Sequence, residues 1–228
     1  MKLIKLSLVA AVLATGMISA QASEVGVSAN MALTSNYVWR GMTQTDDSPA
    51  VQGGIDLDWN GIYAGVWGSN VEFGDGKASL EADLYIGFAK EVSGFSFDIG
   101  FIEYMYPNMM DEYNFGEAYV GLGYDFGVVN VGAKYSFGID THNDVNDIDA
   151  EWEPENAWEV SASAPLPMEF SIDATYGDYD SLGAYYLVGI NKSFDKFDFT
   201  LAYTANDGGV SGSEAEQDNV VVSVATSF

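Results

Sequence analysis

The sequence predicts an all-β fold, a transmembrane antiparallel up-and-down β-barrel of about twelve strands. Three observations lead to this prediction. Apolar and polar residues alternate with a period of two along most of the chain. The segments that connect the alternating stretches are short and long in turn. Aromatic residues gather at the ends of the stretches, where a membrane barrel carries its aromatic girdles.

The alternation is clear in the fourth stretch, where Leu80, Leu84 and Phe88 share one parity and Glu81 and Asp83 take the other. Most stretches approach the roughly 9–11 residues that cross a bilayer at a tilt. Both faces of the third stretch are mixed, so its register stays open. The expected strands, in order, are 25–40, 51–59, 62–71, 80–88, 95–101, 117–124, 129–137, 158–163, 170–177, 183–191, 197–204 and 220–228.

The connections alternate in length. Asn60-Gly61 is a strong signal for a tight hairpin. The other short connections lie near 91–94, Phe126, 165–167 and Asp195. Short turns in the periplasm and longer outer loops are typical of a bacterial outer-membrane barrel. The longer, polar connections are 41–50, 72–78, 107–114, 140–156, 178–181 and 205–218.

The aromatic residues form two expected bands. The band beside the short turns is Trp59, Phe88, Phe95, Phe126, Phe194, Phe197 and Phe228. The band at the opposite rim is Trp39, Trp158, Tyr176 and Tyr203. A secreted β-sandwich or lipocalin-like barrel would also alternate. Its outer parity would be polar and studded with Lys, whereas the polar parity here is small and acidic, which suits a wet lumen.

The first residues predict a secretory signal peptide. Lys2 and Lys5 form a positive start, residues 6–14 are largely apolar, and Ala20-Gln21-Ala22 supplies a small-x-small cleavage site. The apolar run is shorter than the about 20 residues that a spanning helix needs. We therefore expect a signal peptide at 1–22 and an outer-membrane barrel at 23–228, exported through the periplasm.

Composition limits the partners. The chain has 34 acidic residues against 8 Lys and Arg, a formal net charge of −26, so nucleic acid is excluded as a partner. It has no Cys, which excludes disulfides. A 48% hydrophobic and 14% aromatic composition argues against disorder. The expected partners are outer-membrane lipid and lipopolysaccharide, small polar solutes, and the outer-membrane assembly machinery, for which the terminal Phe228 would be the signal.

Several motifs resemble a known family. Residues 35–45 (SNYVWRGMTQT), 49–54 (PAVQGG) and 61–71 (GIYAGVWGSNV) resemble the TorF-type porins, proteobacterial outer-membrane proteins that share the Gcw_chp conserved domain. Residues 81–87 (EADLYIG) and 104–107 are similar to the family as well. The resemblance covers nearly the whole mature chain. It implies an outer-membrane barrel with a pore function and names no solute.

The polar parity gives the candidates for a lumen that selects ions. Rings of carboxylates favour cations in a pore. The alternative is a solvated polar face without a selectivity filter. The acidic candidates are Asp56, Asp58, Glu81, Asp83, Asp98, Glu117, Glu159, Asp173 and Asp198.

Two basic residues share that parity. Arg40, the single Arg of the chain, is expected at the top of the first strand. It would be either a constriction residue that faces lumen carboxylates or one half of an ion pair that holds the first loop. Lys134 is expected as a counter-ion to Glu117 or Glu81, because an unpaired buried charge is costly.

No enzyme, metal site or cofactor is expected. His142, the single His, lies beside Asp140 and Asp144, and a catalytic base would need a partner that the sequence does not place. The acidic segment 144–153 lacks the glycine and spacing of a calcium loop. The expected function is a channel for passive diffusion of small polar solutes, favouring cations or zwitterions. The alternative is a structural or adhesive barrel with an occluded lumen.

Overall fold

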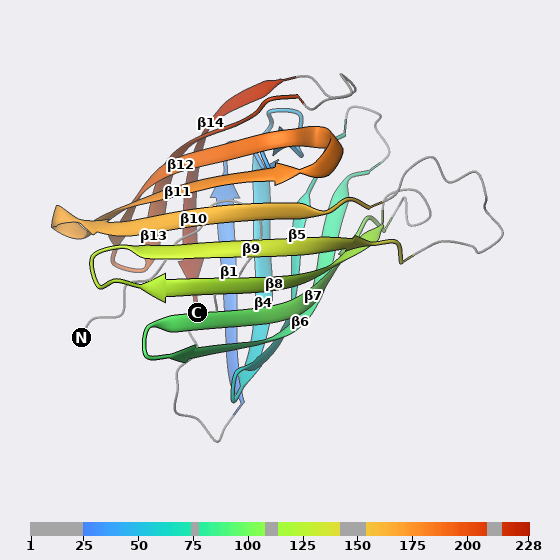
Figure 1. Ribbon diagram of the computed structural model, residues 1–228. Coiled ribbons are helices and arrows are strands. Elements are labelled where there is room, and N and C mark those ends of the chain that lie inside the picture. The colour runs from blue at the N-terminus through green and yellow to red at the C-terminus, as the bar shows by residue number, and fades with distance from the viewer. Residues whose placement is uncertain (1–24, 74–77, 108–113, 142–153, 209–215) are drawn as a thin grey trace.

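The chain folds into one closed antiparallel barrel in the computed structural model (Figure 1). The structure describes residues 25–73, 78–107, 114–141, 154–208 and 216–228. Around the wall, the twelve described barrel strands are β1 (Gly26–Thr34), β4 (Ala50–Trp59), β5 (Ile62–Asn70), β6 (Leu80–Val92), β7 (Phe95–Met105), β8 (Phe115–Asp125), β9 (Asn130–Ile139), β10 (Ala157–Leu166), β11 (Phe170–Tyr179), β12 (Gly183–Phe194), β13 (Phe197–Asn206) and β14 (Gln217–Ser227).

Four short elements lie outside this ladder. The strands β2 (Val38–Trp39) and β3 (Met42–Thr43) pair only with each other. The 3-10 turns η1 (Pro167–Glu169) and η2 (Asp180–Leu182) connect β10 to β11 and β11 to β12. Within the described ranges, no helix has the length and apolar character needed to cross a membrane.

The first and last strands close the sheet. β1 pairs with β4 on one side and with β14 on the other. The backbone N–H of Phe228 donates to the carbonyl of Ala29 over 2.8 Å. Gly26 pairs with Asp58, directly before the Asn60-Gly61 turn, so Val25 and Phe228 lie at the end of the short turns. The predicted twelve-stranded antiparallel barrel is confirmed.

The short turns have the backbone geometry that twisted hairpins need. Asn60 and Gly61 have φ of 53° and 90°, and Ser93 and Gly94 have φ of 54° and 85°. Positive φ at both central residues is the signature of a type I′ turn, whose twist matches the strands it joins. We call this end of the barrel the short-turn end and the opposite end the long-loop end.

The outer face of the barrel is apolar. On β5, whose register the sequence left open, Ile62 and Val66 point outward and are about half exposed, whereas Tyr63 and Trp67 share the inner parity. All seven aromatic residues predicted beside the short turns are exposed. At the other rim Trp158 is exposed and packs on an exposed neighbouring ring of Tyr176. This is the surface that a bilayer covers, with aromatic rings at both interfaces.

One part of the predicted girdle is wrong. The first strand ends at Thr34 instead of continuing to Arg40, and Trp39 is buried inside the barrel with only 9% of its surface exposed. Tyr37 is buried too, although it continues the lipid-facing parity. The Thr34 hydroxyl donates to the Asn36 carbonyl over 2.8 Å, and the chain turns inward at this point. Residues 41–45 therefore lie in the barrel interior instead of forming part of an outer loop, whereas residues 46–49 are exposed.

Tyrosines line the inner wall in a repeated arrangement with glycines. Tyr63, Tyr85, Tyr119 and Tyr185 each lie opposite a glycine on the adjacent strand, and each ring end covers that glycine. A Cβ on Gly87 would meet the Tyr63 hydroxyl at 2.3 Å and the Ile99 carbonyl oxygen at 2.8 Å. The rings follow the wall, because each glycine leaves room for a ring.

A substitution at this packing site should destabilise the barrel. We expect Gly87→Ala to lower the free energy of unfolding by about 1–3 kcal/mol, since overpacking against a ring and a backbone carbonyl forces both to move. Gly121→Ala is the matched control, because its Cβ would meet atoms no closer than 3.5 Å. Urea unfolding of both variants in the same detergent micelles measures the difference. Equal stabilities would contradict the packing account.

Candidate functional site

Residues 35–49, which we call the inner hairpin, connect β1 to β4 at the long-loop end, and residues 36–45 of this segment fold into the lumen. Its strands β2 and β3 are joined at Arg40 and Gly41, which have φ of 47° and 83°. The tight turn lets the segment reverse within the width of the barrel. Thr45 is fully buried, and its hydroxyl accepts from the Tyr37 N–H at 3.1 Å and donates to the Ser48 carbonyl at 2.6 Å.

One side of the inner hairpin is tied to β13 and β14 by polar contacts. The Asn206 amide donates to the Gly41 carbonyl over 2.9 Å, and the Thr43 N–H donates to the Gln217 side-chain oxygen over 2.9 Å. Asn36 donates to Asn219 over 3.1 Å. These bonds join backbone or buried amides to one stretch of the wall, so the hairpin has a fixed position there.

The other side packs on rings from distant strands. The Trp39 ring makes edge contacts with Tyr104 at 5.9 Å, Phe115 at 6.3 Å and Tyr179 at 5.3 Å between centroids. Tyr37 makes an edge contact with Trp67 at 5.5 Å. The hairpin therefore touches β5, β7, β8, β11, β13 and β14, and so it spans the lumen from wall to wall.

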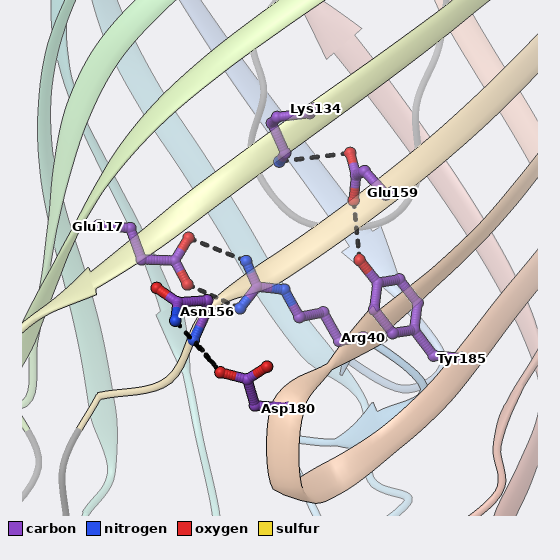
Figure 2. A network of polar contacts seen from close by, with 7 residues as sticks. All are labelled: Arg40, Glu117, Lys134, Asn156, Glu159, Asp180 and Tyr185. Carbon is purple, nitrogen blue, oxygen red and sulfur yellow. Dashed lines mark hydrogen bonds and ion pairs between the residues drawn. The ribbon is translucent and has the colours of Figure 1, made fainter.

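Arg40 forms the strongest polar contact of the hairpin (Figure 2). Its two terminal nitrogens donate to the two carboxylate oxygens of Glu117 on β8 over 2.7 and 2.9 Å. Both side chains are nearly inaccessible, at 5% and 2% exposure. Burial alone would lower the pKa of Arg40, but the Glu117 charge and hydrogen bonds outweigh it and raise the pKa above its ordinary value. Such a two-pronged pair fixes the hairpin tip against the wall.

Lys134 has a different partner from the two that the sequence suggested. It pairs with Glu159 at 3.3 Å, because β9 and β10 place these two residues directly opposite each other. The Tyr185 hydroxyl donates to the other oxygen of Glu159 over 3.0 Å (Figure 2). The expected pairing with Glu117 or Glu81 was wrong, since register fixes the partner and sequence does not reveal register.

Glu81 and Asp83 lie side by side on the inner face of β6, each with 1% of its surface exposed. Glu81 accepts hydrogen bonds from the Tyr37 hydroxyl at 2.8 Å and the Tyr106 hydroxyl at 3.0 Å. Burial, followed by the charges of Glu81 and Asp83, raises the pKa of Tyr37 well above its ordinary value, so its hydroxyl stays protonated and donates. Neither oxygen of Asp83 has a hydrogen-bond partner among the described residues.

The remaining predicted carboxylates lie on the inner parity, mostly toward the short-turn end. Asp56, Asp58, Asp98 and Asp198 are partly exposed, whereas Asp173 is buried. Most have a neutral donor: Tyr85 and Asn30 for Asp56, Tyr63 for Asp98 at 2.7 Å, Asn191 for Asp173, and Ser193 for Asp198 at 2.5 Å. Neutral donors leave the negative charge in place, so this part of the wall is acidic.

Two predicted features lie outside the described residues, namely His142 and the acidic segment 144–153. Among the residues that the structure describes, no group of three or more His, Cys, Asp or Glu side chains could hold a metal ion. The sequence did not reveal that Tyr37 and Trp39 face the lumen. The one local signal was Arg40-Gly41, a pair that tolerates a sharp reversal at the place where the strand was expected to continue.

The chain belongs to the Gcw_chp family, described as bacterial protein of unknown function, whose profile matches residues 19–228. A comparison with curated protein sequences gives no match. Among solved structures it is similar to the NanC porin, with a TM-score of 0.56, 12% identity, and coverage of 89% of this chain and 99% of that one. It is also similar to the KdgM porin in complex with disordered oligogalacturonate, with a TM-score of 0.59, 11% identity, and coverage of 89% of this chain and 98% of that one.

A third similar structure is the outer membrane phospholipase A from Escherichia coli, with a TM-score of 0.51, 13% identity, and coverage of 87% of this chain and 92% of that one. At these identities the likeness concerns the fold alone. All three are outer-membrane barrels, and the apolar exterior with its aromatic rims agrees with them. The predicted membership of the Gcw_chp family and the outer-membrane location are confirmed.

The Arg40–Glu117 pair should behave as a coupled unit. Arg40→Gln or Glu117→Gln alone leaves one buried charge without its partner, which we expect to cost about 3–5 kcal/mol of unfolding free energy. The double variant should recover most of that loss. Lys192→Gln is the control, because its pair with Glu169 is 31% and 76% exposed and worth about 1 kcal/mol or less.

Urea unfolding measures the stabilities, and amide hydrogen exchange of residues 37–45 reports the hairpin itself. Additive losses in the double variant, or unchanged exchange in both single variants, would show that the pair does not hold the hairpin.

Proposed function

We propose that this member of the Gcw_chp family is a narrow outer-membrane channel for small polar solutes, favouring cations and zwitterions. The observation that carries the proposal is the charge of the inner wall. All nine predicted carboxylates lie on the inner parity, against Arg40 and Lys134, each of which is already paired with a carboxylate. Low-dielectric walls focus such a field and enrich cations inside.

The partly exposed carboxylates are the ones that a passing ion would meet. Asp56, Asp98 and Asp198 come from β4, β7 and β13, which are separated by other strands around the wall, so the three residues do not form one patch. Their hydrogen-bond donors are hydroxyl and amide groups, which carry no charge. An anion entering this part of the lumen would meet repulsion from several sides.

The inner hairpin sets the width of the path. A barrel of twelve strands is already narrower than general porins of roughly 16–18 strands. The hairpin crosses the lumen at the long-loop end, so the open cross-section there is what remains between its side chains and the wall. We therefore propose slow passage of small solutes at low conductance.

An occluded structural or adhesive barrel is the second candidate. It is favoured by the cluster of buried rings around Trp39, which lies in the lumen at the level of the hairpin. If those rings leave no continuous path for water, the barrel does not conduct. The Phe228 side chain is exposed at the carboxyl terminus. That it acts as the signal for the assembly machinery stays a prediction for both candidate functions.

The similar proteins bear on the solute only through chemistry. The KdgM porin is described with oligogalacturonate, whose repeating units carry carboxylates. The acidic inner wall of this chain would repel such a polyanion, so we do not propose that ligand here. We propose no enzymatic activity from the likeness to the phospholipase, because it concerns the fold alone.

The channel proposal predicts small, cation-selective conductance of purified protein in planar bilayers. In a salt gradient the reversal potential should shift toward the equilibrium potential of the cation. The triple variant Asp56→Asn, Asp98→Asn, Asp198→Asn should reduce that shift by roughly half or more, because each Asn keeps the hydrogen bond and loses the charge. The shift should also weaken near 1 M salt, where the screening length is about 3 Å.

The matched control removes the same number of charges from the long-loop rim, with Asp178→Asn, Asp207→Asn and Asp218→Asn. Glu117 is unsuitable for this test, since its neutralisation also breaks the ion pair with Arg40. Preference for anions would refute the charge argument.

Removal of the inner hairpin separates the two candidates. Thr34 and Ala50 are opposite each other at the ends of β1 and β4, so a short Gly-Asn-Gly turn can replace residues 35–49. We expect single-channel conductance to rise several-fold in this variant. Wild-type protein without conductance and a conducting variant would establish the occluded barrel. A folded variant with unchanged conductance would show that the hairpin does not limit the path.

A further inference from the structure

Two carboxylates are enclosed together beside the inner hairpin, and among the residues that the structure describes neither has a cationic partner. Glu81 and Asp83 are each 1% exposed, and both point inward from β6 because they share its parity. The lumen-facing cations in the described part of the chain are used elsewhere, since Arg40 binds Glu117 and Lys134 binds Glu159. Two buried negative charges that lie two residues apart on one strand repel each other, so something must neutralise them.

The surroundings of the two residues differ in one respect that matters. Glu81 is satisfied by the Tyr37 and Tyr106 hydroxyls. Asp83 lies between Trp67 on β5 and Tyr104 on β7, and both of its oxygens lack a hydrogen-bond partner among the described residues. A buried carboxylate with two free oxygens is the kind of group that binds a cation.

We propose that Glu81 and Asp83 bind one hard divalent cation of the calcium class, enclosed between β6 and the inner hairpin. The donor atoms on offer are carboxylate and phenol oxygens, which suit hard cations and not soft ones. A single divalent ion balances the two carboxylates. The Glu81 oxygens each accept one hydrogen bond and keep a lone pair for a metal.

The burial of Glu81 and Asp83 limits the size of the cation that can bind between them. Tyr37, Trp67, Tyr104 and Tyr106 lie around the two buried carboxylates, which favours a small ion over an organic cation as the ligand. Calcium tolerates irregular coordination completed by water, whereas magnesium demands near-ideal octahedral geometry. With only two carboxylates, we expect a dissociation constant on the order of 10⁻⁴–10⁻³ M.

The ion would also fasten the inner hairpin. Tyr37 belongs to the hairpin and donates to Glu81 from above, so the ion and Tyr37 bind the same carboxylate. Because the ion binds only the folded barrel, its binding then stabilises the inner hairpin in its place in the lumen by mass action. This inference does not depend on whether the lumen conducts.

Terbium(III) luminescence of the purified full-length barrel in detergent micelles tests the site, with excitation through tyrosine and tryptophan. Wild-type protein should show a saturable signal that calcium displaces. In Asp83→Asn the luminescence that calcium displaces should be at least roughly five-fold weaker than in wild type. Asp58→Asn is the matched control, because it removes one lumen carboxylate at the short-turn end, and it should keep the signal. Terbium bound to acidic loops contributes equally to all three proteins, so it does not affect the comparison.

Calcium should also raise the thermal unfolding midpoint of wild type and of Asp58→Asn, and not that of Asp83→Asn. Equal calcium effects in wild type and Asp83→Asn would overturn the proposal and leave a shared proton as the neutralising group. Should Asp83→Asn fail to fold, Glu81→Gln serves as the second variant. Crystals of wild type soaked in terbium give an independent test of the site. An anomalous difference map without a peak beside Glu81 and Asp83 would also overturn the proposal.

Discussion

Closure of the sheet is the constraint on which the rest of this structure depends. In hydrocarbon every backbone N–H and C=O must find a partner within the protein, and a sheet achieves this only when its first and last strands pair. Here β1 bonds to β14 as well as to β4. Closure gives each strand one face toward lipid and one toward the lumen, so the period of two in the sequence becomes an apolar exterior and a polar, acidic interior.

A closed barrel encloses an interior that polar side chains alone do not fill. Near the short-turn end, tyrosine rings lie over glycines and deliver their hydroxyls to carboxylates along the wall, as Tyr63 does for Asp98. At the long-loop end the inner hairpin occupies the lumen. Its rings pack as in a soluble core, and its one cation, Arg40, reaches Glu117 where water is excluded. The acidic wall and the hairpin are therefore separate features, one acting on charge and the other on width.

The sequence predicted what depends on local pattern. Strand number, lipid-facing parity and the Asn60-Gly61 turn follow from neighbouring residues. The inward path of the first connection did not follow, because Tyr37 and Trp39 continue the lipid-facing parity. Their place is decided by Tyr104, Phe115 and Tyr179, which are distant in sequence. The partner of Lys134 was missed for the same reason, since only the register of β9 against β10 sets it opposite Glu159.

Cysteine cross-linking measures the inner hairpin most directly, because the chain has no Cys of its own. The Asn36 and Asn219 side chains meet at 3.1 Å, where the first part of the inner hairpin lies against β14. In the double variant Asn36→Cys, Asn219→Cys, a short bis-thiosulfonate reagent should link the two positions rapidly in the folded barrel in lipid, and in urea the link should not form. A Cys at position 36 that stays unlinked, and that reacts with a bulky external thiol reagent as fast as a Cys at exposed position 216, would contradict a hairpin folded inside the lumen.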